Sequence, residues 1–179
     1  LFPETVDEDS EKALTNTSIT QPALYIIEFA LAKVLIDEKI TPKYLIGHSI
    51  GEYAAAALAG VFDFETGLKV VIKRGQLMQS MPSGTMFAVR STYQLLDEIK
   101  QNLFEIAAEN APESCTISFE TKNSEQVKDI LDKSDIRYIP LNTSHAFHSE
   151  AFDPILEEFA AYVENCTTNA PQIPVISCF

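Results

Sequence analysis

The five residues Gly-His-Ser-Ile-Gly at positions 47–51 constrain the fold of this chain more than any other feature. The apolar run 44–46 before them is typical of a short buried strand, and the alanine-rich segment 52–59 after them predicts a helix. The motif therefore stands at the joint between a strand and a helix, with Ser49 near its centre.

This arrangement matches the G-x-S-x-G pattern of a nucleophile elbow, in which a serine sits on a sharp turn and its hydroxyl projects into a cleft. The glycines leave room where side chains would clash. The first amides of the following helix, with their positive dipole end, point toward the same place. The pattern predicts Ser49 as a nucleophile and the Ile50 N–H as a donor to an oxyanion.

A serine nucleophile needs a base, and the chain has three histidines. His48 adjoins the serine and is expected to shape the turn. His145 and His148 lie in the segment NTSHAFHSEAF, where a predicted small domain returns to a large one. A base at such a hinge would lie beside a cleft, although two histidines in a polar loop also fit a purely structural role.

The remaining elements indicate an α/β chain with an insertion. Between 85 and 142 the pattern is strand, helix, strand, strand, helix, strand, which is the βαββαβ order of a ferredoxin-like unit. We predict a small domain at 85–142 and a large α/β domain made of 1–84 and 143–179, with a parallel sheet like that of the α/β-hydrolases. Further helices are expected at 20–40, with Pro22 in its first turn, at 63–81, with Asp63 as N-cap, and at 148–166, and a last strand at 172–177.

Charge and cysteine content limit the classes of function. Thirteen basic residues against 26 acidic ones give a net charge of -13, which argues against binding nucleic acid or an anionic membrane. Cys115, Cys166 and Cys178 match no zinc or redox spacing, so we expect free thiols and no metal. No apolar run is expected to span a membrane, and the acidic start lacks the features of a signal peptide. A cytoplasmic location is expected.

Four segments together carry a family resemblance. GHSIGEY, TQPAL, RGQLMQSMPSGTM and HAFHS occur in the order and spacing of the malonyl-type acyltransferase domains of polyketide and fatty acid synthases. The resemblance covers essentially the whole chain. It implies an enzyme that moves a malonyl unit from malonyl-CoA, through an acyl-serine, to the phosphopantetheine thiol of an acyl carrier protein. It implies no covalently bound cofactor, and neighbouring synthase domains such as a ketosynthase as partners.

The resemblance also assigns roles to individual residues. Ser49 resembles the family's nucleophile and His148 its general base. Arg74 resembles the arginine that pairs with the malonyl carboxylate, a task that suits its planar fork. Gln21 resembles a glutamine near the active site, and Asn110 falls where the family often has Asn-x-Pro.

Substrate selection is expected at the HAFH segment. It resembles the malonyl-selecting form of the motif, whereas methylmalonyl-selecting relatives have Tyr-Ala-Ser-His. Phe147 would fill the space beside the malonyl C2, next to His145 and His148, and Ile50 agrees with the same preference. A pocket that rejects one extra methyl group discriminates by about 1–3 kcal/mol. His48 and His145 complete the expected substrate-binding set.

Two other functions stay open on the sequence. A serine hydrolase or thioesterase also uses G-x-S-x-G, and Asp129, Asp132 or Asp135 could supply its acid. An inactive acyltransferase-like scaffold is the other reading. The glycine- and glutamine-rich first strand of the family and its later asparagine are not seen, so we expect a piece of a longer domain, incomplete at both ends.

Overall fold

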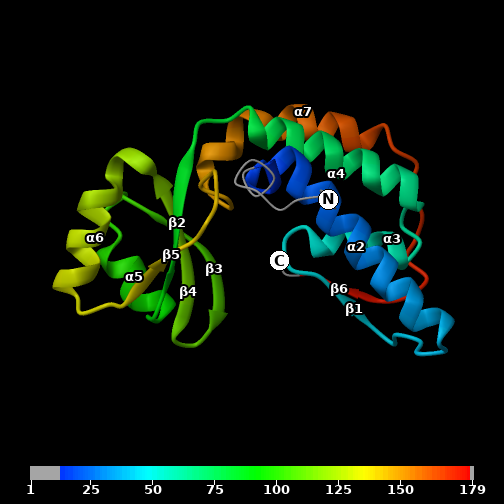
Figure 1. Cartoon of the computed structure of the whole chain (residues 1–179), viewed down its shortest axis with the longest axis horizontal. Helices are drawn as coiled ribbons and strands as arrows, with labels where there is room; N and C mark the ends of the chain where they lie inside the picture. Colours follow the sequence, from blue (N-terminus) through cyan, green and yellow to red (C-terminus); the bar gives the residue numbers. More distant parts are fainter. Residues whose placement is uncertain (1–12, 178–179) are drawn as a thin grey trace. The chain divides into compact units, whose positions relative to one another are not determined.

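The computed structural model describes residues 13–177, and the chain divides into two compact units. The large unit consists of residues 1–78 and 157–179, and the small unit of residues 79–156. Figure 1 shows the elements of both. The range 85–142 predicted for the small domain lies inside the small unit, which extends further on both sides.

The small unit is built on a four-stranded antiparallel sheet in the order β3-β4-β2-β5. This is the strand order of a ferredoxin-like fold, and the elements follow the predicted βαββαβ sequence. Along the chain they are β2 (Gly84–Val89), α5 (Tyr93–Ile99), β3 (Glu105–Ala111), β4 (Ser114–Glu120), the short 3-10 turn η1 (Thr121–Asn123), α6 (Ser124–Lys133), β5 (Tyr138–Pro140) and the 3-10 turn η2 (Glu150–Phe152).

The core of the small unit lies between the sheet and its two helices. Alternate residues of β2 and β4 point toward α5 and α6, as the two-residue period of a strand requires. Phe87 meets Phe119 edge to face with ring centroids 5.0 Å apart. The buried members of this core are Phe87, Val89, Leu96, Phe104, Cys115, Ile117, Phe119, Val127, Leu131 and Ile136.

The large unit places a parallel strand pair among helices. Strand β1 (Leu45–Ile46) pairs in parallel with β6 (Val175–Ile176), and β1 leads through the GHSIG motif into α3 (Gly51–Leu58). This pair agrees with the parallel sheet predicted for the large domain, but β1 is not the buried strand that was expected, because Ile46 is 69% exposed. The other helices are α2 (Thr17–Asp37), α4 (Phe64–Gln79) and α7 (Asp153–Glu164), of which α7 begins in the small unit.

Helix α2 begins three residues before the expected start. Asn16 is its N-cap, and its side-chain oxygen accepts a hydrogen bond of 3.0 Å from the Ser18 N–H. Pro22 therefore lies in the second turn, not in the first. Because proline has no N–H, the Ser18 carbonyl receives no helical hydrogen bond from position 22.

Helix α2 also corrects the expectation about membrane spans. It has 21 residues, and an 18-residue window with no more than two charges has a mean hydropathy of 1.5, which is long and apolar enough to cross a membrane. A single helix of this kind is weak evidence for a membrane span, although only 17% of the window is buried in the structure. Here Glu28 and Lys33 interrupt the apolar sequence, and α2 packs along α3.

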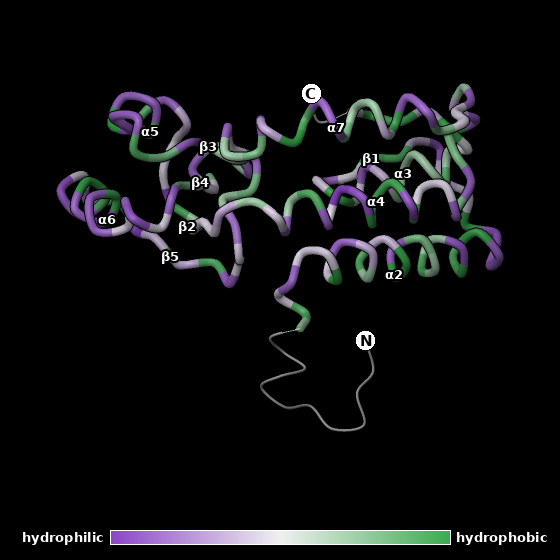
Figure 2. The backbone as a smooth tube through the Cα atoms, turned by 90° about the horizontal axis from the view of Figure 1, so that it is seen from above, coloured by the Kyte–Doolittle hydropathy of each residue, from purple (hydrophilic) through white to green (hydrophobic). Residues whose placement is uncertain are grey.

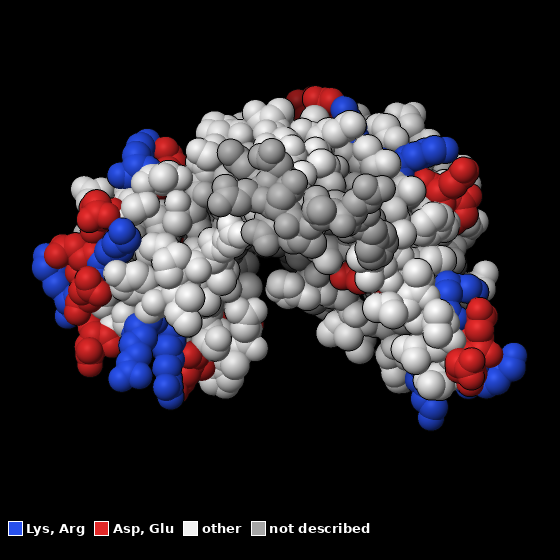
Figure 3. Space-filling model, viewed as in Figure 1, with Lys and Arg blue, Asp and Glu red and all other residues white. Residues whose placement is uncertain are grey.

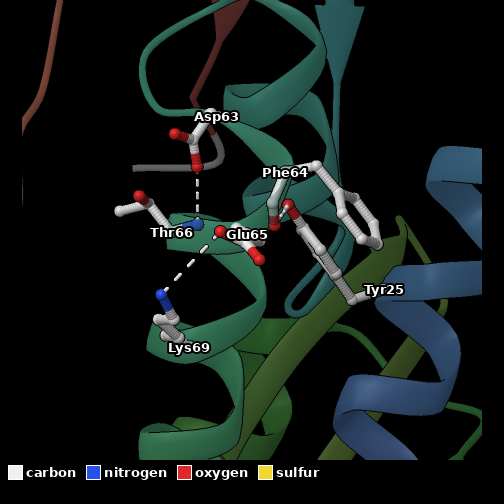
Figure 4. A network of polar contacts seen from close by, with 6 residues as sticks. All are labelled: Tyr25, Asp63, Phe64, Glu65, Thr66 and Lys69. Carbon is white, nitrogen blue, oxygen red and sulfur yellow. Dashed lines mark hydrogen bonds and ion pairs between the residues drawn. The ribbon is translucent and has the colours of Figure 1, made fainter.

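The start of α4 is fixed against α2 by a small polar network (Figure 4). Asp63 caps α4 as predicted, because its carboxylate accepts from the Thr66 N–H at 2.7 Å. The buried Tyr25 hydroxyl donates to the Phe64 carbonyl at 3.1 Å. A Cβ on Gly67 would lie 2.2 Å from that hydroxyl, so the glycine makes room for it.

Candidate active site

Ser49 adopts the backbone conformation of a nucleophile elbow. Its φ is 53°, in the left-handed region that costs a residue with a side chain about 1 kcal/mol or more. The turn is closed by hydrogen bonds from the Gly51 N–H to the His48 carbonyl at 3.0 Å and from the Glu52 N–H to the Ser49 carbonyl at 3.1 Å. The strand–turn–helix predicted around Ser49 is confirmed.

The two glycines of the motif are needed to different degrees. A Cβ on Gly47 would lie 2.2 Å from the Glu52 nitrogen and from the Gly51 carbonyl carbon, so a side chain would overlap backbone that cannot move aside. A Cβ on Gly51 would meet only the Glu28 carboxylate, at 3.7 Å, which is an ordinary contact. Close approach of the backbone therefore requires the first glycine and not the second.

The backbone after Ser49 offers a donor for an oxyanion. Ile50 precedes the first residue of α3, and its side chain is buried in the core of the large unit. Among residues 13–177 its N–H has no hydrogen-bond acceptor, whereas the next two amides are both bonded within the turn. An unused N–H beside the nucleophile, at the positive end of α3, is what the predicted oxyanion donor requires.

A cavity of about 590 Å³ adjoins the elbow within the large unit. The motif residues Gly47, His48 and Ser49 line it, together with α2 and α3, and the His48 side chain is exposed there. Glu28 also faces this cavity, and burial raises the pKa of its carboxyl group. Its Oε2 atom is buried and has no hydrogen-bond partner among the described residues.

Arg74 is held by two neighbours in the large unit. Its Nη1 donates to the Gln21 side-chain oxygen at 2.5 Å, and its guanidinium lies over the ring of Tyr53 at 5.6 Å from the centroid. Gln21 in turn donates to the Thr17 hydroxyl at 2.7 Å, which fixes the orientation of its amide. Tyr53 lies on α3, one turn after Ser49, so Arg74 contacts the same helix that follows the elbow.

Local packing explains why Gln21 reaches Arg74. A Cβ on Gly75 would lie 2.9 Å from the Thr17 carbonyl oxygen, so Gly75 lets the start of α2 approach α4 closely. Burial lowers the pKa of Arg74, while the adjacent Tyr53 hydroxyl opposes this shift. The predicted clamp is therefore a half-buried, oriented guanidinium whose other N–H groups can meet a carboxylate.

His145 is a buried structural histidine in the small unit. Its Nε2 lies 3.0 Å from the Met81 carbonyl oxygen, so this nitrogen carries the proton. Its Nδ1 then accepts from the Ser144 hydroxyl at 2.7 Å. Both ring nitrogens of His145 have hydrogen-bond partners within the small unit. The expected role of His145 in substrate binding stays a prediction.

The ring of Phe147 is fixed by an aromatic cluster. It stacks on Phe152 with centroids 5.9 Å apart and planes at 6°, and His145 lies 5.9 Å from it. Phe152 is buried, while Phe147 is half-buried. A Cβ on Gly84 would lie 2.3 Å from the Ala146 nitrogen, so this glycine lets the HAFH segment lie directly on the start of β2.

His148 is exposed and has a left-handed backbone, with φ of 59°. The residues after it are pinned: the Ser149 hydroxyl donates to the Ala146 carbonyl at 2.6 Å, and the Glu150 N–H donates to the Glu105 carboxylate at 3.0 Å. Ser49 belongs to the large unit and His148 to the small unit, and their pairing stays a prediction.

Asn110 lies at the edge strand β3, in the small unit. Its side chain is exposed and donates to the Thr116 hydroxyl at 3.1 Å across the β3–β4 pair. Its substrate-binding role stays a prediction, and the structure gives it a task within the sheet. Sequence reasoning missed Tyr53 and Phe152; the first follows the motif by one helical turn, and the second carries no sequence signal beyond being aromatic.

No group of three or more metal-binding side chains occurs within residues 13–177. Cys115 and Cys166 are free thiols, and Cys178 lies outside the described residues. Asp129, one candidate acid of a hydrolase triad, forms an exposed ion pair with Lys133 along α6.

Known proteins resemble this chain along nearly its whole length. The sequence profile of the acyl transferase domain matches residues 3–179. Mycoketide-CoA synthase of Mycobacterium tuberculosis is 39% identical over 168 residues, which are 93% of this chain and 4% of that protein. The polyketide biosynthesis malonyl CoA-acyl carrier protein transacylase of Bacillus velezensis is 37% identical over 178 residues, which are 95% of this chain and 62% of that protein.

Solved structures show the same likeness. The acyltransferase domain from the second module of the salinomycin polyketide synthase superposes with a TM-score of 0.87 and 36% identity, over 96% of this chain and 41% of that one. The malonyl CoA-acyl carrier protein transacylase of Burkholderia pseudomallei superposes with a TM-score of 0.82 and 39% identity, over 94% of this chain and 60% of that one.

The fold and the serine elbow thus define an α/β chain with a nucleophile elbow and an antiparallel, ferredoxin-like unit. The chain belongs to the acyl transferase domain family. It spans less than two thirds of the length of the relatives named above.

Proposed function

We propose that this chain forms the central part of a malonyl-CoA:acyl carrier protein acyltransferase. The observation that carries the proposal is the elbow: Ser49 is held at φ 53°, beside an unused Ile50 N–H at the start of α3. In the same unit, a half-buried guanidinium is oriented by Gln21 and Tyr53. A nucleophile beside a carboxylate-binding group suits a substrate that has an acid at one end.

The reaction proceeds in two half-reactions. Ser49 Oγ attacks the thioester carbonyl of malonyl-CoA while His148 accepts the hydroxyl proton. The Ile50 N–H donates to the carbonyl oxygen as it becomes negative. The C–S bond then breaks, and the CoA thiolate leaves with the proton from His148. The phosphopantetheine thiol of a carrier protein attacks the malonyl-serine ester by the same steps in reverse, which restores Ser49.

Arg74 decides the class of acyl group in this proposal. A guanidinium can grip a carboxylate with two parallel N–H···O bonds, which also fixes the malonyl group in one orientation. Phe147 is proposed to lie against the malonyl C2 and to exclude a methyl branch. Its half-buried ring stacks on Phe152, and this supports the role because the contact favours one position of the ring.

The partners follow from the reaction. The acceptor is an acyl carrier protein, and neighbouring synthase domains such as a ketosynthase are proposed because the chain resembles domains inside such synthases. The free thiols of Cys115 and Cys166 support a reducing, cytoplasmic location.

The test is labelling of the protein, extended to the length of its relatives, with malonyl-CoA, followed by mass spectrometry of the intact chain. One malonyl group is expected on Ser49 and none on Ser49→Ala. Addition of a carrier protein should discharge the label onto the carrier. Release as free malonate, with no transfer to any carrier, would instead indicate a thioesterase.

Arg74→Ala serves as the companion variant for substrate choice. It should lose the preference for malonyl-CoA over acetyl-CoA while Ser49 still becomes acylated. An unchanged preference in Arg74→Ala would contradict the carboxylate clamp. No label on Ser49 in the wild-type protein would support an inactive scaffold.

A further inference from the structure

The three arginines of the chain occupy two different settings. Arg74 is half-buried and bonded to Gln21 in the large unit. Arg90 and Arg137 are exposed, and both belong to the small unit. The reaction proposed above uses neither of them, so their placement needs a separate explanation.

Arg90 and Arg137 lie directly opposite each other on neighbouring antiparallel strands. The register of β2 and β5 pairs Val89 with Tyr138, and one step further the Arg90 N–H donates to the Arg137 carbonyl at 2.9 Å. Side chains directly opposed in an antiparallel pair share one face of the sheet, and like charges there destabilise the pair. The fold gains no stability from this juxtaposition.

The shared face is the one turned away from the helices. Val89 and Ile136 are buried in the core of the small unit, so the adjacent positions 90 and 137 project from the other side of the sheet. Ile139 lies two residues after Arg137 on the same face, with 69% of its surface exposed. Two guanidinium groups and one exposed aliphatic side chain therefore lie together.

Every lysine of the small unit has an acidic partner, whereas the two arginines have none among residues 13–177. The four ion pairs are Lys100–Asp97 at 2.7 Å, Lys122–Glu120 at 2.7 Å, Lys128–Glu125 at 2.8 Å and Lys133–Asp129 at 2.5 Å. Acidic and basic side chains of this unit are accordingly interspersed in Figure 3. Within residues 13–177, no carboxylate lies within 4.0 Å of the guanidinium nitrogens of Arg90 or Arg137.

A cavity of about 430 Å³ adjoins the pair at the end of the sheet, where α5 begins and α6 ends. Arg90 and Arg137 line it, and so do Thr92 and Ser134, whose hydroxyls can donate to an incoming carboxylate. Ser91 lines it as well, but its hydroxyl donates to the Thr92 carbonyl at 3.4 Å. Glu113 and Asp135 also line the cavity, beyond ion-pair distance of either arginine. The forks of both arginines are thus left for a group from outside this unit.

We propose that Arg90, Arg137 and Ile139, the arginine surface, dock an acidic protein. Arginine forks bind carboxylates bidentately, and arginine beside an apolar side chain is typical of protein interfaces. A chain with a net charge of -13 otherwise repels an acidic partner, so the positive charge of the arginine surface would guide that partner to this place. The proposal rests on the proposed function, because the carrier that takes the malonyl group is the protein that must bind in every turnover.

The test separates the two half-reactions of the protein, extended to the length of its relatives. Arg90→Glu/Arg137→Glu should leave acylation of Ser49 by malonyl-CoA unchanged. Transfer from Ser49 to an acidic carrier protein should become about tenfold slower at low salt, mostly through a higher KM, and the difference should shrink as salt is added.

The matched control is Lys122→Glu/Lys128→Glu, which changes the net charge by the same amount at two lysines that already have acidic partners. It should transfer malonyl to the carrier as the wild-type protein does. Equal transfer by the arginine variant and the wild type would overturn the proposal, and so would an equal loss in the lysine control.

A second variant guards against a folding defect. Arg90→Gln/Arg137→Gln removes the like-charge contact, so its melting temperature should stay the same or rise, while carrier transfer still slows. A lower melting temperature together with slower acylation of Ser49 would show a structural pair and overturn the docking role. If the wild-type protein labels Ser49 but transfers malonyl to no carrier, the proposed function fails as well. If both arginine variants transfer malonyl normally, only the docking role of the arginine surface is wrong.

Discussion

The small unit encloses a core of ten buried residues between one sheet and two helices, whereas the large unit leaves one whole helix with many apolar side chains at the surface. Leu96, Val127 and Leu131 in the small unit have no exposed surface. Along α2 of the large unit, by contrast, Leu31 and Val34 are 63% and 58% exposed. Figure 2 shows apolar residues along the length of this helix.

The difference indicates where the two units obtain their stability. The small unit has a core of its own, which is the condition for folding independently. The large unit carries the elbow and the arginine clamp on helices with open apolar surface, and surface of this kind is what further protein covers. The solved relatives do have more chain: this one corresponds to 41% and 60% of the two described above.

Gly47→Ala should have the largest effect and would test how strictly the elbow is built. The added methyl would overlap the backbone of residues 51 and 52 at 2.2 Å, and overpacking against backbone costs about 3 kcal/mol or more. We expect loss of Ser49 acylation. Gly51→Ala is the control, and it should keep both fold and acylation. Equal activity of the two variants would show that the first glycine is not required.

Leu131→Ala against Leu31→Ala tests the contrast between the cores directly. Deleting the fully buried Leu131 side chain should lower the free energy of unfolding by about 3 kcal/mol. Leu31→Ala should change it by about 0.5 kcal/mol or less in the 1–179 chain, as expected for an exposed position. Denaturant unfolding measures both.

The same pair of variants in the protein at the length of its relatives sharpens the comparison. If additional chain covers α2, the cost of Leu31→Ala should rise to about 2 kcal/mol or more. A cost that stays near zero in the longer protein would mean that α2 keeps its apolar face exposed.

Phe152→Ala tests whether the small unit contributes to substrate choice through packing. Loss of the stacking partner would free the Phe147 ring, so selectivity for malonyl-CoA over methylmalonyl-CoA should fall by about tenfold. The rate with malonyl-CoA should change much less. Phe152→Tyr keeps the ring and should keep the selectivity. If Phe147→Ala relaxes selectivity and Phe152→Ala does not, the stacking contact is not what fixes the ring.

Tyr25→Phe should lower the free energy of unfolding by only about 1 kcal/mol, because it removes one hydrogen bond from the core of the large unit. Burial raises the pKa of Tyr25 to about 12, above its ordinary value of 10.0. The neutral hydroxyl therefore stabilises the folded state fully below pH 10, and this contribution is lost as the pH rises from 10 to 12. Between pH 10 and 12, the free energy of unfolding should fall less steeply with pH in Tyr25→Phe than in the wild type. An identical pH dependence of the two proteins would contradict the assignment.

The sequence predicted local elements well because each has its own signal. Strand β4 occupies residues 114–120 as expected, since Cys115, Ile117 and Phe119 alternate with polar neighbours. The elbow was equally readable, because two glycines, a strand and a helix all lie within 17 residues. The start of α2 was misplaced because Pro22 was taken to mark its first turn, while the actual cap is Asn16.

Contacts between distant segments were not readable. Gln21 and Arg74 were each predicted near the active site, but their hydrogen bond depends on Gly75 letting α2 approach α4, a packing detail with no local signature. The partners of the His145 ring, which are the Met81 carbonyl and the Ser144 hydroxyl, could not be predicted from the sequence either. The opposition of Arg90 and Arg137 likewise depends on strand register, which composition does not show.

The contact between Gly84 and the HAFH segment has a consequence for engineering. The Gly84 N–H donates to the Ser144 carbonyl at 3.2 Å, and the Gly84 Cα lies against Ala146 so closely that no side chain fits. The points where the polypeptide enters and leaves the antiparallel sheet are thereby clasped together. Residues 79–156 should therefore be exchangeable as one segment in chimaeras with related proteins. Junctions outside 84–146 would transfer Phe147, His148 and the residues that support them together. A junction between 84 and 146 would join two parts that do not fit each other at this contact.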